Sequence, residues 1–201
     1  HQHYGRYEND SLSIKSAFAL FKQALADENI PLQIGFAAEV RIEPEIVSWV
    51  EQGLIPFLGQ KDTKNLILLE LPHSHIPAGT QNMVSWLASQ NIVPVIAHPE
   101  RNKEVMSDAK KIIPLYNLGC LFQLTSGAVA GQFGEPSRLT AEQLLKGGYV
   151  TLLASDSHNL KHRPPELEPG RRAAEMIIGE SASWDLVKTN PEAISAMHFN
   201  P

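Results

Sequence analysis

Hydrophobic residues follow two alternating patterns along the chain. Short, nearly continuous apolar runs such as NLILLEL, IVPVIA and VTLLA alternate with segments in which apolar residues recur every three or four positions. The first pattern is typical of strands buried on both faces, and the second of amphipathic helices. Strands are therefore expected at residues 31–42, 63–71, 92–99, 120–127 and 149–158. Helices are expected at residues 11–30, 43–53, 79–91, 107–119, 140–148, 169–180 and 189–197.

This alternation predicts βαβ units and an α/β fold with a parallel sheet. At least five β/α units are visible, which favours a closed or distorted (β/α) barrel over an open doubly wound sheet. No GxGxxG motif follows a strand, so a nucleotide-binding interpretation has no support. Asn9 or Asp10 is expected to cap the first helix, and Pro114 to break or kink the fourth.

Composition narrows the class of protein. The 201 residues, 43% of them hydrophobic, are enough for one sizeable core, so one domain is expected. The net charge of −5 and the lack of a basic stripe argue against nucleic-acid binding. The apolar runs are too short to insert into a membrane, and the single cysteine fits a reducing compartment. A cytoplasmic protein is expected.

The beginning of the chain is unusual. It opens on His1 without a methionine and continues with the polar segment HQHYGRYEND. A natural domain rarely begins on such a segment, so we expect that an N-terminal portion is missing from this chain.

Four of the expected strands end in side chains that can bind metals. The apolar runs stop at Glu39, Glu70, His98 and Asp156, and His158 follows two residues after Asp156. In parallel β/α folds the carboxyl ends of the strands converge on one rim, where catalytic groups from several strands meet. Taken singly, a glutamate at a strand end is usually a solvated loop residue, and a lone histidine fits a hydrogen-bonded rim position equally well. The repetition across four strands is what indicates a site.

The chemistry of this set is that of a metal centre. Carboxylates and imidazoles without a thiolate suit Mn²⁺, Fe²⁺, Zn²⁺ or Mg²⁺. Two metals about 4 Å apart can clamp an in-line phosphoryl displacement and ionise a bridging water. Arg101 and Arg163 follow His98 and His158 closely and are suited to bidentate binding of phosphate oxygens. His73 and His75 lie in a proline-flanked loop, and a role for them in substrate binding is left open.

Several motifs, in this order, resemble a known family: GRYEN, EVRI, LLELPHSHIP, VIAHPERN, QLTSGAVAGQFG and ASDSHN. They are similar to the bacterial protein-tyrosine phosphatases of the PHP (polymerase and histidinol phosphatase) superfamily, of the manganese-dependent CpsB/YwqE type found in capsule and exopolysaccharide loci. The resemblance runs from His1 to about Pro191, and AHPER with SDSHN at this spacing is its specific part. It implies a single PHP-type domain over residues 1–201, a distorted (β/α)7-type barrel that lacks its first β/α unit in this chain.

The resemblance also implies a role for individual residues. The implied metal ligands are Glu39, which bridges two metals, Glu70 and His98 for the second metal, Asp156 for the first, and His1 and His158 for the third. Arg101 and Arg163 match arginines that bind the substrate phosphate. In this family a metal-bridging hydroxide attacks phosphorus directly, and no phospho-enzyme forms.

One departure from the family pattern keeps alternatives open. The family begins with a strand that carries His-x-His and then an aspartate, and these ligands are absent here. His3 stands where relatives often place polar residues, so a ligand role is not assigned to it. The chain could instead be a non-catalytic module with an incomplete metal site. Within enzymes, the alternative is a phosphomonoesterase for a small metabolite such as histidinol phosphate.

The single cysteine argues independently for metal chemistry. Cysteine-dependent tyrosine phosphatases need a Cys-x5-Arg loop, but the residue six positions after Cys120 is Ser126. A tyrosine phosphatase with this sequence must therefore use metals, and the resemblance implies two or three, with Mn²⁺ first. It also implies a phosphotyrosine protein substrate, the tyrosine-rich tail of a bacterial tyrosine autokinase that controls polysaccharide export. Whether the chain forms a homo-oligomer is left open.

Overall fold

The computed structural model describes residues 1–199 of the chain. Eight strands form one sheet in the order β2-β1-β3-β5-β6-β7-β8, with β4 paired to β5. The pairs β1–β2 and β4–β5 are antiparallel, and the other neighbours are parallel. The strands are β1 (Gln2–His3), β2 (Tyr7–Glu8), β3 (Glu39–Arg41), β4 (Gly59–Lys61), β5 (Lys64–Glu70), β6 (Ile92–Ala97), β7 (Leu121–Thr125) and β8 (Leu152–Ala154).

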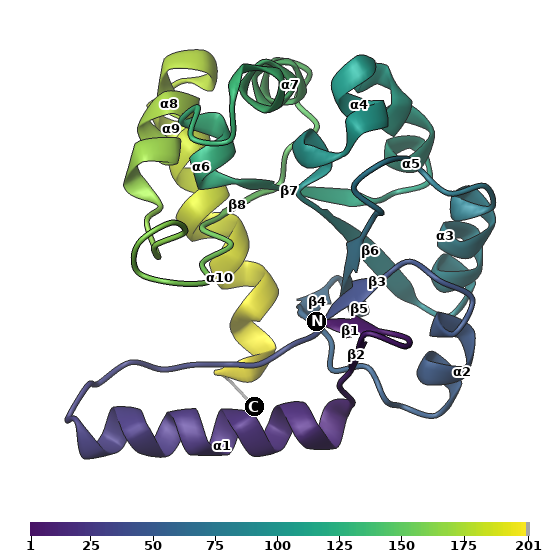
Figure 1. Cartoon of the computed structure of the whole chain (residues 1–201), viewed down its shortest axis with the longest axis vertical. Helices are drawn as coiled ribbons and strands as arrows, with labels where there is room; N and C mark the ends of the chain where they lie inside the picture. Colours follow the sequence, from purple (N-terminus) through teal and green to yellow (C-terminus); the bar gives the residue numbers. More distant parts are fainter. Residues whose placement is uncertain (200–201) are drawn as a thin grey trace.

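Helices cover the outside of this sheet, and Figure 1 shows α2, α3 and α5 on its right side, α4 and α7 across the top, and α6, α8 and α9 on its left side. The helices are α1 (Ser11–Asp27), α2 (Ile46–Glu51), α3 (Thr80–Ser89), α4 (Lys103–Ser107), α5 (Ile113–Asn117), α6 (Ser126–Val129), α7 (Glu135–Lys146), α8 (Glu168–Ile178), α9 (Glu180–Trp184) and α10 (Asn190–Ser195). No helix within residues 1–199 is long and apolar enough to cross a membrane.

The expected α/β architecture with a parallel sheet is confirmed, but a closed or distorted barrel is not. Among residues 1–199, the path of paired strands ends at β2 on one edge and at β8 on the other, so the sheet is open. β1 has two residues and β8 has three. Such short strands offer few backbone groups with which the two sides of the sheet could pair.

The expected strand at residues 31–42 is wrong in its extent, because only Glu39–Arg41 forms β3. A strand is stabilised by hydrogen bonds to a neighbouring strand. This segment meets its neighbours only from Glu39 onward, where Glu39 lies beside Leu68 of β5 and Val40 beside Gln2 of β1. Residues 31–38 therefore remain irregular and connect α1 to the sheet.

Helix α1 forms where the sequence predicts it, and Asp10 is its cap. Ser13 N donates to Asp10 Oδ1 (2.8 Å) and Asp10 N donates to Ser13 Oγ (2.9 Å), so the two residues form a capping box. The apolar positions of the helix are largely exposed, 75% for Leu20 and 57% for Phe21. Figure 1 shows α1 lying apart from the other helices, with the following segment running back along it towards β3.

Two further expected helices begin at different residues from those predicted. Pro114 lies in the first turn of α5, and residues 109–112 form a separate 3₁₀ turn, so proline does break the predicted helix 107–119. Helix α7 begins at Glu135, five residues before the predicted start, because Pro136 fits the first turn of a helix.

The two faces of the sheet differ in chemistry. The outer face packs against the helices through fully buried residues of the central strands, among them Val40, Leu69, Ile96 and Phe122. The inner face has a smaller apolar cluster, in which Leu66 and Val95 pack with Ile194 of α10. Side chains alternate along a strand, so the inner positions beyond this cluster are Glu70 and its register neighbours at the carboxyl end of the sheet. The apolar cluster therefore closes the base of the inner face and leaves its polar end open.

Candidate metal centre

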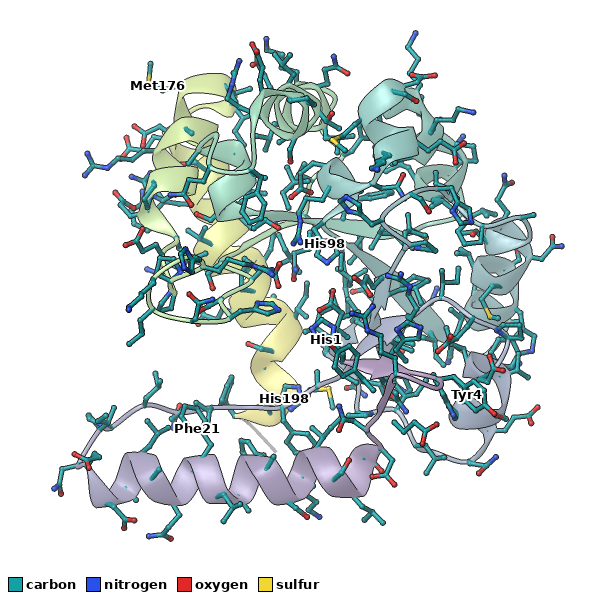
Figure 2. All side chains as sticks on the ribbon, viewed as in Figure 1. His1, Tyr4, Phe21, His98, Met176 and His198 are labelled. Carbon is teal, nitrogen blue, oxygen red and sulfur yellow. The ribbon has the colours of Figure 1, made fainter. Side chains whose placement is uncertain are left out.

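A polar pocket of about 280 Å³ lies at the open end of the inner face. It collects every residue for which the sequence predicts a site role, although these residues come from five separate parts of the chain: His1, Glu39, Glu70, His98, Arg101, Asp156, His158 and Arg163. Figure 2 shows His1 and His98 in the central part of the molecule, away from exposed residues such as Met176 and Tyr4. Their roles as ligands or phosphate-binding groups remain predictions.

The acidic half of the pocket is built around Glu39. His98 Nε2 lies 2.8 Å from Glu39 Oε1 and 3.8 Å from Glu70 Oε1. His1 Nδ1 lies 3.5 Å from Glu39 Oε2. One possible ligand atom from each of His1, Glu39 and Glu70 can be chosen so that all three lie within 4.8 Å of one another. Two carboxylates and two imidazoles from different segments thus face the same small volume.

Glu39 reaches this volume in a way that the sequence does not indicate. It was expected to end a strand, but it is the first residue of β3. Arg41 lies on the same face two residues later, and the parallel register pairs Arg41 with Glu70. The Glu39 side chain therefore enters the pocket from the inner face of the sheet, whereas Glu70 and His98 enter from strand ends.

His98 and Asp156 have left-handed backbone conformations, with φ of 34° and 50°. Residues other than glycine rarely adopt a left-handed backbone conformation, and the strain that it causes is concentrated at functional sites in proteins. His98 N donates to Gln123 O (2.8 Å), which continues the β6–β7 hydrogen bonding past the end of β6. The turn at His98 then directs the chain into the following proline, glutamate and arginine.

The other half of the pocket is organised by Asp156, two residues beyond β8. Arg101 Nη1 donates to Asp156 Oδ2 (2.5 Å), and Arg163 Nη2 donates to the same oxygen. His158 Nδ1 lies 2.8 Å from the backbone oxygen of Asp156, which makes Nδ1 the protonated nitrogen. The Nε2 atom of His158 is then the one with a free lone pair, which is how metal-binding histidines are commonly oriented.

The ionisation of Glu39 and His98 is coupled. Burial favours the neutral form of both, but the hydrogen bond and charge of the partner outweigh burial in each case. The pKa of Glu39 is therefore lowered and the pKa of His98 is raised. A divalent cation bound between these two groups would supply the positive charge that favours the ionised Glu39 carboxylate, and it would need His98 in its neutral form.

The residues present fit a hard or borderline divalent cation. The proposed ligands offer carboxylate oxygens and imidazole nitrogens, and no cysteine lines the pocket. Glu70 is held from outside the cluster by Arg41, whose Nη1 lies 2.8 Å from Glu70 Oε2 and also donates to Leu71 O (3.2 Å). Such supporting contacts orient the ligands of metal sites.

Sequence reasoning missed three residues that shape this pocket. Arg41 and Asn102 line it, and Glu100 lies fully buried behind it. Burial raises the pKa of Glu100, whose Oε1 accepts a hydrogen bond from Thr125 N (2.9 Å). All three belong to the EVRI and AHPERN motifs, so their place within those motifs was the available signal.

Other candidates lie at the rim or away from the pocket. His73 is exposed at the rim, whereas His75 does not line the pocket. His3 lines the pocket, but its Nε2 atom lies 3.9 Å from Glu43 Oε2, and His3 is not part of the group formed by His1, Glu39 and Glu70. Cys120 is 2% exposed, and burial raises the pKa of its thiol to about 12. It therefore has neither the position nor the acidity of a nucleophile.

The chain is similar to proteins of capsular polysaccharide synthesis. The family model described as capsular polysaccharide synthesis, CpsB/CapC, matches residues 1–196. The tyrosine-protein phosphatase YwqE of Bacillus subtilis is 34% identical over 165 residues, which cover 81% of this chain and 63% of YwqE. The tyrosine-protein phosphatase CpsB of Streptococcus pneumoniae is 26% identical, with 96% of this chain and 81% of CpsB covered.

A solved structure is also similar. It comes from the crystal structures of YwqE from Bacillus subtilis and CpsB from Streptococcus pneumoniae, which are described as unique metal-dependent tyrosine phosphatases. The TM-score is 0.87 at 28% sequence identity, and the match covers 96% of this chain and 77% of the other. The chain spans 63% of the length of YwqE and of its Staphylococcus aureus relative, so part of these relatives has no counterpart in it.

Proposed function

Because this chain belongs to the CpsB/CapC family, we propose that it is the greater part of a metal-dependent protein-tyrosine phosphatase. The observation that carries the proposal is the convergence of six ligand-type side chains and two arginines in one pocket. A carboxylate that was merely solvated in a loop would not be expected to lie among other ligand-type side chains and arginines. The names of the relatives, which are tyrosine-protein phosphatases, support the same reaction.

The proposed ligands are His1, Glu39, Glu70, His98, Asp156 and His158. Divalent cations bound by these groups would supply Lewis acidity towards phosphate oxygens and would lower the pKa of a coordinated water. The chain's own residues would fix the positions of these cations. The Oε1 atom of Glu39 faces His98 and its Oε2 atom faces His1, so Glu39 is the group best placed to contact more than one cation.

Arg101 and Arg163 are the proposed phosphate-binding residues. Both guanidinium groups point at the Oδ2 atom of Asp156, from opposite ends of a 63-residue stretch of chain, 101–163. A guanidinium has five N–H donors, so each arginine keeps donors for phosphate oxygens beyond those that Asp156 accepts. A phosphate held there would lie between the arginines and the acidic cluster, within reach of both.

Several finer features belong to this proposal. We propose Mn²⁺ as the native metal, the phosphotyrosine tail of a bacterial tyrosine autokinase as the substrate, and the cytoplasm as the location. We also propose that the domain is a distorted (β/α)7-type barrel of the PHP kind. The closeness of the two ends of the strand path supports this: the path ends at β2 and β8, and the rings of His1, which precedes β1, and His158, which follows β8, have centroids 5.8 Å apart.

Hydrolysis of a phosphotyrosine peptide with Mn²⁺ and with EDTA tests the reaction. We expect turnover with Mn²⁺ and none with EDTA, and faster turnover of the peptide than of histidinol phosphate. Equal turnover with excess EDTA would reject the metal mechanism. A preference for histidinol phosphate would move the substrate to the small metabolites.

The variants His98→Ala and Asp156→Ala test the site itself. Each removes a proposed ligand, so we expect activity to fall by more than about a hundredfold, with fewer bound metals by elemental analysis. His162→Ala is the matched control, because His162 is exposed and does not line the pocket. Full activity in both site variants, or fewer than two metals in the unaltered protein, would favour a non-catalytic module instead.

A further inference from the structure

Phe133 contacts both of the proposed phosphate-binding arginines. The Cζ atom of Arg101 lies 4.9 Å from the centre of the Phe133 ring, and that of Arg163 lies 5.9 Å from it. Both distances are within the range of cation–π attraction. Phe133 lies in the turn between α6 and α7, about 30 residues from each arginine along the chain. One aromatic ring thus joins two guanidinium groups that come from separate loops.

The contact with the ring and the contact with Asp156 use different parts of each guanidinium. Asp156 Oδ2 accepts N–H groups at the edge, whereas an aromatic ring attracts the charge of the guanidinium as a whole and occupies no acceptor. Phosphate would compete with Asp156 for the N–H groups but not with Phe133. The aromatic contact is therefore compatible with phosphate binding and can persist when the Asp156 contacts change.

The ion pair with Asp156 uses only Nη2 of Arg163 and leaves another part of its guanidinium without a polar partner. Its Nε atom is buried and has no hydrogen-bond partner among the described residues. A buried donor without an acceptor destabilises the arrangement that buries it. Contact with the ring is thus one of the few interactions that keep this part of Arg163 in place.

The position of the ring depends in turn on Gly127. A Cβ atom at residue 127 would lie 2.8 Å from Phe133 Cε2 and 2.6 Å from Gln132 Oε1. The end of the Gln132 side chain can turn away, but the ring is rigid and would have to move. Gln132 N donates to Gly127 O (2.7 Å), which keeps this turn tight. The absence of a side chain at residue 127 therefore gives the ring its place.

We propose that Phe133 is a positioning residue that holds Arg101 and Arg163 together as one binding site for a phosphate group. The inference rests on the proposed function, in which these arginines bind the substrate phosphate. Phe133 does not itself touch the reacting atoms. It reduces the freedom of two long side chains before phosphate arrives, so that less conformational entropy is lost on binding.

Binding of inorganic phosphate, measured by calorimetry on the metal-loaded full chain, tests this role. Inorganic phosphate has no aromatic ring, so direct stacking of a substrate ring on Phe133 cannot contribute. We expect Phe133→Leu to weaken phosphate binding by about tenfold, the size expected when cation–π contacts with partly buried guanidinium groups are lost. Phe133→Trp, which keeps an aromatic face, should restore most of the affinity. Phe57→Leu is the matched control, because Phe57 is also partly buried but, among the described residues, its ring lies against neither Arg101 nor Arg163.

Gly127→Ala provides a second, independent variant. It leaves the ring intact but displaces it, so we expect a loss of phosphate affinity similar to that of Phe133→Leu. In the double variant with Phe133→Leu, the two losses should not add, because both act through the same ring. If Phe133→Leu does not fold, as judged by its thermal unfolding, Phe133→Met serves in its place.

The results distinguish this inference from the proposed function. Phosphate affinity in Phe133→Leu and Gly127→Ala equal to that of the unaltered protein would overturn the positioning role, even if Mn²⁺-dependent hydrolysis is normal. An equal loss in Phe133→Trp and Phe133→Leu would also overturn it, because the aromatic face would then not matter. Absence of hydrolysis in the unaltered protein would reject the proposed function, and the phosphate measurement would still report on the two arginines.

Discussion

The ion pair between Arg41 and Glu70 supports a proposed metal ligand, although Arg41 is not itself a ligand. Arg41 Nη1 lies 2.8 Å from Glu70 Oε2, on the side of Glu70 that faces away from His98. The guanidinium leaves Oε1 of Glu70 facing the acidic cluster, and its charge offsets repulsion between Glu70 and Glu39. Supporting partners of this kind commonly contribute about 10- to 100-fold to metal affinity.

Arg41→Met should therefore weaken Mn²⁺ binding by about tenfold or more, while the fold is retained. Methionine keeps the apolar stem of the side chain but not its charge or its donors. Titration calorimetry with Mn²⁺ measures the change. Arg172→Met is the control, because Arg172 is a surface arginine of α8 outside the pocket. Unchanged Mn²⁺ affinity in Arg41→Met would show that the ion pair with Arg41 does not help Glu70 to bind the metal.

At the scale of elements, one asparagine joins a helix start to a loop at the pocket rim. Asn102 Oδ1 accepts from Glu104 N (3.0 Å) and Val105 N (3.1 Å), which caps α4. Its Nδ2 donates to Pro72 O (2.6 Å) and His75 O (2.9 Å). The loop after β5, with its exposed histidines, is thus tied to the chain that follows His98 and Arg101.

Asn102→Ala should lower the free energy of unfolding by about 2–4 kcal/mol, since it removes a helix cap and two partly buried hydrogen bonds. Asn102→Asp keeps the capping oxygen but not the donors, so its loss should be smaller. Urea unfolding measures both, and Asn82→Ala, at an exposed position of α3, is the control. Losses below 1 kcal/mol in Asn102→Ala would show that the loop holds its place without this residue.

Helix α8 depends on an ion-pair network at its first turn. Glu168 accepts from Arg171 Nε (2.7 Å) and Nη2 (2.9 Å) and from Arg172 Nε (2.7 Å), and these bonds lower the pKa of Glu168 to about 2. Arg171 also lies over the ring of Trp184 (4.4 Å) and has only 8% of its side chain exposed. The network therefore ties α8 to α9.

The stabilisation from Glu168 should depend on pH in a defined direction. Its pKa is lowered in the folded state, so the contribution is fully present above the ordinary carboxyl pKa of 4.5 and is lost as pH falls towards about 2. The melting temperature of Glu168→Gln should thus lie below that of the unaltered protein at pH 6, and the gap should shrink between pH 4.5 and 2. Thermal unfolding across this range measures it. A gap that stays constant with pH would contradict the ion-pair origin.

At the scale of the whole molecule, the pocket joins parts of the chain that have little else in common. Glu39 comes from β3 and Glu70 from β5, whereas His98 follows β6 and His1 directly precedes β1. A cation that binds these groups together would bind only the folded chain, because the unfolded chain cannot hold them in one place. The free energy of cation binding would then add to the free energy of unfolding of the chain.

Saturating Mn²⁺ should therefore raise the melting temperature, and EDTA should remove the increase. Free Mn²⁺ at 100 times its dissociation constant corresponds to about 2.7 kcal/mol of added stability for one site. Differential scanning calorimetry measures the shift, and His98→Ala should show a much smaller one. Identical melting temperatures in Mn²⁺ and EDTA would contradict a metal centre that bridges these segments.

The linear order of residues was enough to predict the alternating strands and helices and the parallel sheet. These features follow from local rules, since a buried strand needs an apolar run and a surface helix needs an apolar stripe. The same holds for the capping residue Asp10 and the break at Pro114. The convergence of Glu70, His98 and Asp156 could also be expected, because parallel strands end on the same rim.

The tertiary structure decided what depends on register and on close approach between distant segments. It made Glu39 the first residue of β3 rather than the last, since pairing with β5 begins there. It set Arg41 beside Glu70, brought Phe133 against two arginines, and left the sheet open between β8 and β2. No local pattern carries this information, because which residues touch is determined only when strands take their register and loops pack around one pocket.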